Sequence, residues 1–226
     1  MKKTKNILII GDSSIPPRDE TPYQYTYSTL LKLMHTNTRV ESSSKTGMSS
    51  KYIYKKLDPL MLYGYNPDVV ILNYGIVDVY PRPYPNRIYR LLSCSGLLTY
   101  VDKFLKKTGL YYKLGDFFNF KEVSLQKFET YSESIIQKLL ERKVEKIIII
   151  GIIKPYKVLL KSRKVNDEIE RYNEVYKKLS SKYKEVEYID IYEESDEDFT
   201  IWDGYHYSKK ASKYLSETIE KLIYND

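Results

Sequence analysis

The segment Ile7-Leu8-Ile9-Ile10-Gly11-Asp12-Ser13-Ser14 places a serine directly after a short, fully apolar run. Four consecutive aliphatic residues followed by glycine are typical of a buried strand in a parallel sheet. A serine hydroxyl at the end of such a strand attacks a substrate only when a neighbouring base takes its proton. The segment therefore predicts a buried strand that presents Ser13 as a candidate nucleophile.

The candidate base is one of two histidines, His35 and His206. Asp203 lies three residues before His206, a spacing at which one turn of chain can orient the imidazole ring. His35 ends an apolar helical pattern, where the expected role is that of a helix C-terminal residue. We therefore predict that Ser13, His206 and Asp203 act as nucleophile, base and orienting carboxylate.

Five apolar runs alternate with amphipathic patterns along the chain. The predicted strands are Asn6–Gly11, Thr38–Ser42, Asp68–Asn73, Lys146–Gly151 and Val186–Asp190. The predicted helices are Tyr25–Met34, Ser49–Leu62, Ser124–Glu141, Asp167–Lys184 and Ser208–Ile223, with Ser208 as an N-cap. This alternation predicts the α/β class, as one three-layer α/β/α domain with a five-stranded parallel sheet.

The residues of chemical interest all follow predicted strands. Ser13 follows the first strand, residues 42–47 follow the second, and residues 75–82 follow the third. Ligands of such sheets bind beyond the carboxyl ends of the strands. These segments are therefore expected to meet at one edge of the sheet.

Four sequence blocks resemble those of the SGNH, or GDSL-like, hydrolases. They are Gly11-Asp12-Ser13-Ser14, Gly47, Gly75-Ile76-Val77-Asp78 and Asp203-Gly204-Tyr205-His206, in the order of that family and across most of the chain. The resemblance implies a flavodoxin-like fold and esterase activity through the three residues predicted above. It also implies an oxyanion and substrate-binding region that includes the backbone N–H groups of Ser13 and Gly47, together with Gly75 and Asp78.

Val77 departs from the family pattern. The third block is usually Gly-x-Asn-Asp, whose asparagine side chain helps to hold the oxyanion, and valine donates no hydrogen bond. The loss of one oxyanion donor typically costs about 3 kcal/mol. The chain thus resembles a variant subgroup with Gly-Ile-Val-Asp, and we expect either a slow enzyme or a replacement donor.

Arg82 is the candidate replacement, because it lies four residues after Asp78 in a proline-rich loop. Its guanidinium has the chemistry to stabilise an oxyanion or to bind the carboxylate of an acidic sugar. The alternative is a structural ion pair between Arg82 and Asp78 that fixes the loop.

Residues 79–119 contain no obvious strand and are long for a connection. We expect a partly helical insertion, or lid, within a single domain of residues 1–226; a surface decoration or a dimer contact is the alternative. Its apolar piece Leu91–Leu105, with lysines nearby, is also typical of a helix that makes a peripheral contact with a membrane surface.

Composition narrows the class of protein further. The 226 residues are 42% hydrophobic and carry one cysteine, Cys94, so one core without an intrachain disulfide is expected. The apolar run after the charged residues 1–6 is too short for a signal peptide or a membrane span, which favours a cytoplasmic protein. The 25 tyrosines suit a sugar-binding surface, and a biased coding sequence explains them equally well.

The charge pattern argues against other partners. Although the net charge is +7, the lysines are interspersed with glutamates, so we expect no nucleic-acid partner. The acidic run at residues 193–198 lacks the ligand spacing of a calcium loop, so neither a metal nor another cofactor is expected. The pattern does not fix the oligomeric state.

Three functions remain. A serine esterase that hydrolyses small O-acyl esters, such as acetyl groups on a carbohydrate, ranks first. An O-acyltransferase of surface-polysaccharide biosynthesis ranks second, since it would use the same residues and differ only in passing the acyl group to a sugar hydroxyl. A catalytically idle glycan-binding relative ranks third, because Val77 lacks the donor.

Overall fold

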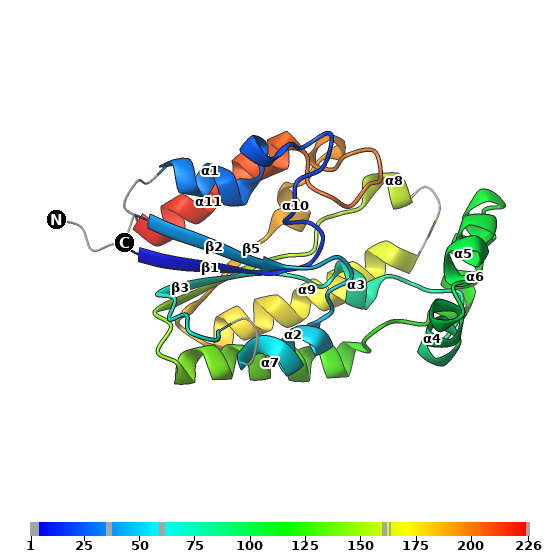
Figure 1. Cartoon of the computed structure of the whole chain (residues 1–226), viewed down its shortest axis with the longest axis horizontal. Coiled ribbons are helices and arrows are strands. Elements are labelled where there is room, and N and C mark those ends of the chain that lie inside the picture. Colours follow the sequence, from blue (N-terminus) through cyan, green and yellow to red (C-terminus); the bar gives the residue numbers. More distant parts are fainter. Residues whose placement is uncertain (1–4, 35–37, 59–61, 160–161, 163, 225–226) are drawn as a thin grey trace.

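The computed structural model describes residues 5–34, 38–58, 62–159, 162 and 164–224. Its centre is a five-stranded parallel sheet in the order β2-β1-β3-β4-β5 (Figure 1). The strands are β1 (Lys5–Gly11), β2 (Thr38–Ser44), β3 (Val69–Asn73), β4 (Lys146–Ile150) and β5 (Val186–Ile189). All five predicted strands are confirmed, with ends that differ by two residues at most.

Helices cover both faces of the sheet, as the alternating sequence pattern predicts (Figure 1). The helices are α1 (Tyr27–Met34), α2 (Ser50–Lys56), α3 (Ile76–Val79), α4 (Asn86–Cys94), α5 (Leu98–Lys107), α6 (Leu110–Phe118), α7 (Leu125–Glu141), α8 (Tyr156–Leu159), α9 (Lys164–Lys182), α10 (Ile191–Glu194) and α11 (Lys209–Tyr224), with single 3₁₀ turns at η1 (Tyr23–Tyr25) and η3 (Glu197–Phe199). In the described parts of the chain, every helix is too short or too polar to traverse a lipid bilayer.

The core lies on both sides of the sheet because the central strands are apolar at nearly every position. Every residue of β3 is buried, as are the four isoleucines that end β4. Helices α2, α7 and α9 close one side, and α1 and α11 close the other. Such continuous apolar strands are stable only when helices cover both faces of the sheet.

Two helix ends show how local sequence sets the boundaries. The Ser208 hydroxyl accepts a hydrogen bond from the Ala211 N–H at 3.3 Å, which confirms the predicted N-cap of α11. Helix α2 ends at Lys56, earlier than the predicted Leu62, and Leu57 and Asp58 continue from it as a π-helical turn. Residues 59–61 of that prediction lie outside the described residues.

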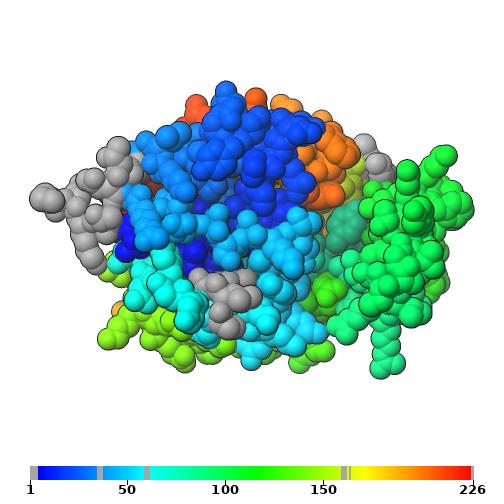
Figure 2. Space-filling model, in the orientation of Figure 1, coloured from blue at the N-terminus to red at the C-terminus, as the bar shows by residue number. Residues whose placement is uncertain are grey.

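Residues 79–119 contain the three helices α4, α5 and α6, which stand together beyond the carboxyl ends of the strands (Figure 1). In the space-filling view they form a block at one end of the molecule (Figure 2). The two ends of this insertion meet at a neck, where the Arg82 N–H donates to the Phe120 carbonyl at 2.7 Å. Beyond the neck, Lys121 pairs with Glu168 of α9 and ties the insertion to the body.

Asp78 joins the loop after β3 to the start of α2. Both of its carboxyl oxygens accept the Ser50 N–H, at 3.0 and 3.1 Å, and Oδ1 also accepts the Ser50 hydroxyl at 3.1 Å. The side chain is fully buried, and this burial raises the pKa of Asp78 to about 8 despite the Ser50 donors. The alternative ion pair with Arg82 is wrong, because the Asp78 carboxyl group is held by Ser50 and the Arg82 guanidinium by Glu122.

Replacement of Asp78 should therefore change how stability depends on pH. A carboxyl group whose pKa is raised in the folded state stabilises the fold at low pH and loses that contribution as pH rises toward the folded-state pKa. We expect the unfolding free energy of the wild type, relative to Asp78→Asn, to fall between about pH 4 and about pH 8, with a slope of at most about 1.4 kcal/mol per pH unit. Urea unfolding of both proteins across this range measures the difference, and a difference that is independent of pH contradicts the assignment.

Candidate active site

A hydrogen-bonded chain joins Ser13, His206 and Asp203. The Ser13 Oγ lies 2.9 Å from His206 Nε2, and His206 Nδ1 lies 2.6 Å from Asp203 Oδ2. Ser13 sits in the turn after β1, and the other two residues lie in the loop that leads into α11. The structure therefore brings together the three residues predicted from positions 190 residues apart in sequence.

The loop that carries the histidine is fixed on both sides. The His206 carbonyl accepts the Ile201 N–H at 3.0 Å, and the Tyr207 carbonyl accepts the Thr21 hydroxyl at 2.9 Å. Asp203 Oδ1 accepts the backbone N–H groups of Tyr205 and His206, both at 3.1 Å. These bonds hold the carboxylate and the imidazole in one orientation before any ligand arrives.

Asp203 is suited to remain ionised. Its partial burial opposes ionisation, yet the hydrogen bonds donated by the His206 ring and by the two backbone N–H groups hold the pKa of Asp203 below its ordinary value. An ionised Asp203 accepts a hydrogen bond from the Nδ1–H group of His206, and it would stabilise a positive charge on the ring.

Arg18 fixes the tautomer of the histidine. One of its Nη2 protons points to His206 Nε2 at 2.8 Å, and the same nitrogen donates to the Ser13 carbonyl at 3.1 Å. Because arginine only donates hydrogen bonds, Nε2 must be the acceptor nitrogen of the ring and Nδ1 must carry the proton. This is the tautomer that a general base requires. Sequence reasoning missed Arg18, which belongs to none of the blocks.

Asp12 orders the turn that carries Ser13. Its Oδ1 accepts the Ser14 N–H at 2.9 Å, which closes the turn on its own side chain. Burial raises the pKa of Asp12 to about 6, while the hydrogen bonds from Ser14 act against the rise. Asp12 thus fixes the turn that carries Ser13.

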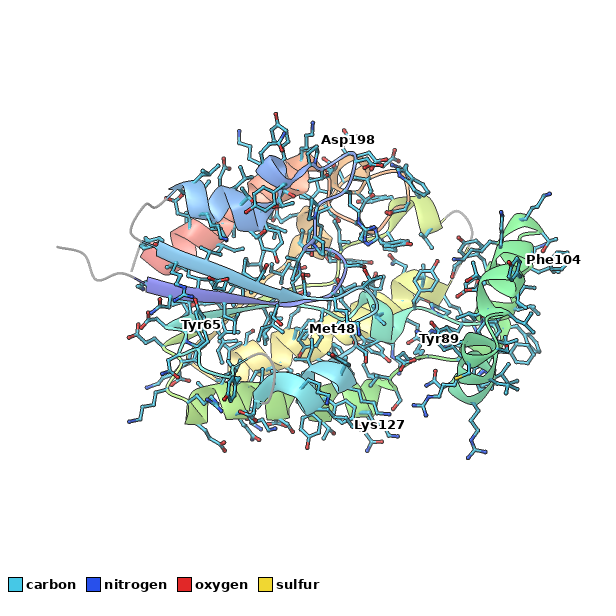
Figure 3. All side chains as sticks on the ribbon, in the orientation of Figure 1. Met48, Tyr65, Tyr89, Phe104, Lys127 and Asp198 are labelled. Atoms are coloured by element: carbon cyan, nitrogen blue, oxygen red, sulfur yellow. The ribbon has the colours of Figure 1, made fainter. Side chains whose placement is uncertain are left out.

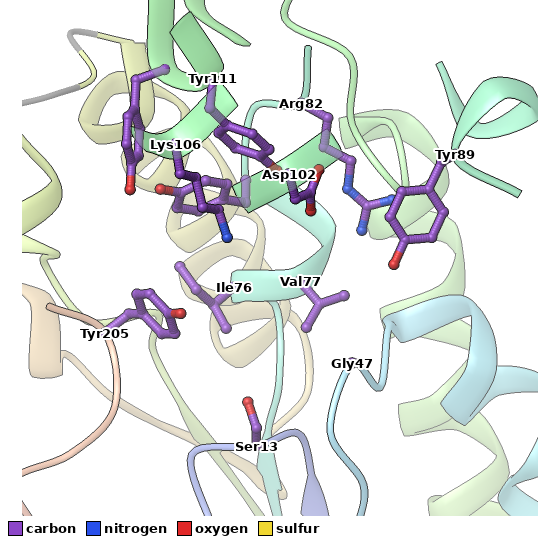
Figure 4. A pocket seen from close by; sticks show the side chains of 12 residues that line it. Ser13, Gly47, Ile76, Val77, Arg82, Tyr89, Asp102, Lys106, Tyr111 and Tyr205 are labelled. Carbon is purple, nitrogen blue, oxygen red and sulfur yellow. The ribbon is translucent and has the colours of Figure 1, made fainter. Parts of the chain in front are cut away.

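The backbone N–H groups of Ser13 and Gly47 are the oxyanion donors that the family resemblance implies. Both residues line the same cavity (Figure 4). Within the described parts of the chain, neither N–H group donates a hydrogen bond, so both are available to a ligand. Gly47 has a φ of +74°, a conformation that favours glycine. The Val77 side chain faces this region and contributes no donor (Figure 4).

The cavity has a volume of about 270 Å³, and the insertion forms much of its wall (Figure 4). Tyr205 comes from the loop that carries His206, and Tyr80 follows α3. The insertion contributes the remaining aromatic rings and two charged groups, namely Tyr89, Asp102, Lys106, Tyr111 and Tyr112. These residues were not predicted individually, because the sequence shows no spacing that would bring them together.

Arg82 lines the cavity but lies at the end away from Ser13 (Figure 4). Its Nη1 bonds Glu122 at 2.7 Å, and its guanidinium stacks 4.6 Å from the ring centre of Tyr89. This placement does not support Arg82 as the replacement oxyanion donor. Lys106, by contrast, directs its ammonium group toward Ile76 and Val77 (Figure 4).

Three other sequence predictions need correction or fall outside the structure. Asp78 is fully buried beneath the loop and is not among the residues that line the Ser13 cavity, so its predicted contact with substrate is wrong. Gly75 is buried as well, and a Cβ there would lie 2.7 Å from the Ile152 side chain, so this glycine serves packing rather than binding. His35 lies outside the described residues. Among the described residues, no cluster of three or more histidine, cysteine or acidic side chains is arranged to hold a metal ion.

Comparison with solved structures identifies the fold. A lipase/acylhydrolase from Enterococcus faecalis superposes with a TM-score of 0.67 at 16% identity, over 97% of this chain and 95% of that one. An acetyl xylan esterase gives 0.68 at 15% identity, over 96% and 99%. A variant acetyl xylan esterase from Geobacillus stearothermophilus gives 0.65 at 17% identity, over 99% and 97%.

No protein-family model matches the sequence, and no curated protein matches it. The superpositions show that the chain has the α/β/α fold of these hydrolases. Because the sequence identities are low, they establish the fold alone.

The nucleophile can be tested by covalent labelling. We expect a fluorophosphonate probe to modify the peptide that contains Ser13, because His206 lies within hydrogen-bond distance of that hydroxyl alone among the described serines. Ser13→Ala should abolish labelling without loss of the folded state, as judged by circular dichroism. Ser14→Ala is the matched control and should still label. Labelling of Ser13→Ala would assign the nucleophile elsewhere.

Proposed function

We propose that the protein is a serine esterase that hydrolyses short O-acyl esters, such as acetyl groups, on a carbohydrate. The observation that carries this proposal is the bonded chain Ser13–His206–Asp203, which begins at the wall of the cavity. This geometry provides a nucleophile, a base in the required tautomer and an orienting carboxylate in one place.

The reaction follows from these contacts. The Ser13 Oγ attacks the ester carbonyl while its proton passes to His206 Nε2, and Asp203 stabilises the resulting imidazolium. The protonated ring then gives that proton to the departing alcohol, which leaves an acyl-serine. Water attacks the acyl group with the same histidine as base, releases the acid and restores Ser13.

Arg18 must lose its hydrogen bond to His206 Nε2 when that nitrogen is protonated. Its N–H and a protonated Nε2 are both donors, so their contact becomes unfavourable in the imidazolium state. The guanidinium already has a second acceptor in the Ser13 carbonyl at 3.1 Å. We infer that Arg18 gives up its bond to His206 Nε2 during the attack, keeps its bond to this carbonyl and remains beside Ser13 as a positive charge.

The cavity supports a short acyl group on a polar alcohol. Its volume of about 270 Å³ is just below the usual range of ligand pockets, about 300 to 1,000 Å³, which disfavours a long acyl chain. Burial raises the pKa of Tyr80, Tyr111 and Tyr205, so their hydroxyl groups stay uncharged at neutral pH and can donate hydrogen bonds. Tyrosine rings that stack while their hydroxyls bind are well suited to a sugar.

A glycan-binding protein without turnover is the second candidate, and Val77 is the observation that favours it. The two functions separate in one assay with p-nitrophenyl acetate and acetylated xylo-oligosaccharides as substrates. The proposed esterase releases acetate from both, and Ser13→Ala does not. Binding of the oligosaccharide without acetate release supports the second candidate. Transfer of acetyl to an added glycan in preference to water would identify an acyltransferase.

Restoring the missing donor should accelerate the enzyme. The Val77 side chain faces the cavity next to Gly47, so an asparagine there would present an N–H group to the oxyanion (Figure 4). Since one such donor is typically worth about 100-fold or more, we expect Val77→Asn to raise kcat on p-nitrophenyl acetate by about tenfold to 100-fold, allowing for an unoptimised position. Val77→Leu, which has no donor, is the control. An equal rise in both variants would mean that space, not hydrogen bonding, limits the rate.

Arg82 and Lys106, the two cationic residues that line the cavity, should affect the binding of negatively charged substrates rather than kcat. We expect Arg82→Ala and Lys106→Ala each to raise KM for an ester with a carboxylate by about tenfold, equivalent to about 1.4 kcal/mol, and to leave kcat for p-nitrophenyl acetate within about twofold. Lys113→Ala, an exposed change in the same insertion, is the control. A fall of about 100-fold in kcat for Arg82→Ala on the neutral ester would instead return Arg82 to the role of oxyanion donor.

A further inference from the structure

The insertion has two faces of opposite character. On α5, Asp102 and Lys106 line the cavity, whereas Tyr100 and Phe104 are exposed, with 63% of Phe104 accessible. Residues two positions apart on a helix point in nearly opposite directions, so these pairs occupy opposite sides of α5. Figure 3 shows the same division for two labelled residues, with Tyr89 on the side toward the sheet and Phe104 on the far side.

Helix α4 repeats the arrangement. Tyr89 lines the cavity, and Leu91, two residues on, is 70% exposed beside Ile88, which is also exposed. We call the four exposed apolar residues Ile88, Leu91, Tyr100 and Phe104 the outer face. Soluble proteins rarely gather large apolar side chains on two neighbouring exposed helices unless the surface binds something.

The exposed charges of the insertion are all of one sign. Within residues 86–119, all of which the structure describes, every exposed charged residue is basic: Arg87, Arg90, Lys103, Lys106, Lys107 and Lys113. The two acidic residues of this segment are partly buried, Asp102 bonded to Tyr84 and Asp116 to Ser162.

On α5 the basic and aromatic residues share one stripe. Tyr100, Lys103, Phe104 and Lys107 recur at the spacing of a single helical face. Long lysine side chains on such a stripe can extend past the aromatic rings and reach the charged head groups while the rings enter the apolar layer.

We propose that the outer face binds the surface of a membrane that contains anionic lipids. The apolar residues supply burial in the lipid interface, and each basic residue near an anionic surface adds electrostatic attraction. A second copy of this chain fits less well, because pairing two such faces would bring basic side chains against one another. The site would then lie about one helix diameter, roughly 10 Å, behind the lipid surface.

Vesicle co-sedimentation tests the proposal with the whole protein. We expect binding to phosphatidylcholine vesicles that contain phosphatidylglycerol, little binding to phosphatidylcholine alone, and weaker binding as salt rises. The double variant Leu91→Ser/Phe104→Ser should bind at least tenfold more weakly. Its control is Leu33→Ser/Tyr63→Ser, which removes residues that are 70% and 85% exposed outside the insertion, and it should bind like the wild type.

The charge contribution has its own pair of variants. Lys103→Glu/Lys107→Glu should weaken binding to the anionic vesicles, whereas Lys55→Glu/Lys56→Glu makes the same change in net charge on α2 and should have a smaller effect. Cys94, exposed and the only cysteine of the chain, allows an environment-sensitive fluorophore to be attached three residues from Leu91. Its emission should shift to the blue on anionic vesicles only.

The proposal is overturned if the protein does not bind anionic vesicles, or if it binds both vesicle types equally. It is also overturned if the control variants lose as much vesicle binding as the test variants, or if the protein is a dimer in solution that Leu91→Ser/Phe104→Ser dissociates. None of the altered residues lines the cavity, so hydrolysis of p-nitrophenyl acetate serves as a separate readout. A protein that hydrolyses this soluble ester and ignores vesicles contradicts the membrane proposal alone, and a protein that binds vesicles without hydrolysis contradicts the esterase alone.

Discussion

The close approach of β1 to β3 at their carboxyl ends is the constraint on which the site depends. Gly11 pairs with Asn73, and a Cβ on Gly11 would lie 1.9 Å from the Asn73 carbonyl oxygen. The next residue, Asp12, donates its N–H to that same oxygen at 3.1 Å, so the chain leaves the sheet in a fixed direction. Ser13 is presented to His206 because this contact admits no side chain at position 11.

The sheet and the bonded chain Ser13–His206–Asp203 were predictable because each depends on local or strongly patterned sequence. Aliphatic runs identify buried strands, and the three-residue spacing of Asp203 and His206 makes one loop sufficient to orient the ring. The environment of Arg82 was not predictable, since its partner Glu122 lies 40 residues away and reaches it only through the neck of the insertion. Arg18 was missed for a similar reason: its position depends on the packing of a loop that has no periodic pattern.

Residues of the insertion that line the cavity alternate along the same helices with residues that face outward. Its inward residues complete the cavity around Ser13, and its outward residues form an apolar and basic surface. A helix two residues out of phase would exchange these sets, so the helical register of α4 and α5 decides which side chains meet a ligand. The tyrosines illustrate this point, because Tyr89 and Tyr111 wall the cavity while Tyr100 faces away.

The neck between Arg82 and Phe120 has a consequence for how such proteins can diversify. The chain enters and leaves the insertion at adjacent points, which are joined by one backbone hydrogen bond of 2.7 Å. The three helices between these points therefore form a closed loop attached to the body of the protein. The entropy of closing a loop grows slowly with its length, so longer or shorter inserts cost the scaffold little. The cavity wall that the insertion supplies can thus change in length and sequence while Ser13, His206 and Asp203 keep their places on an unchanged sheet.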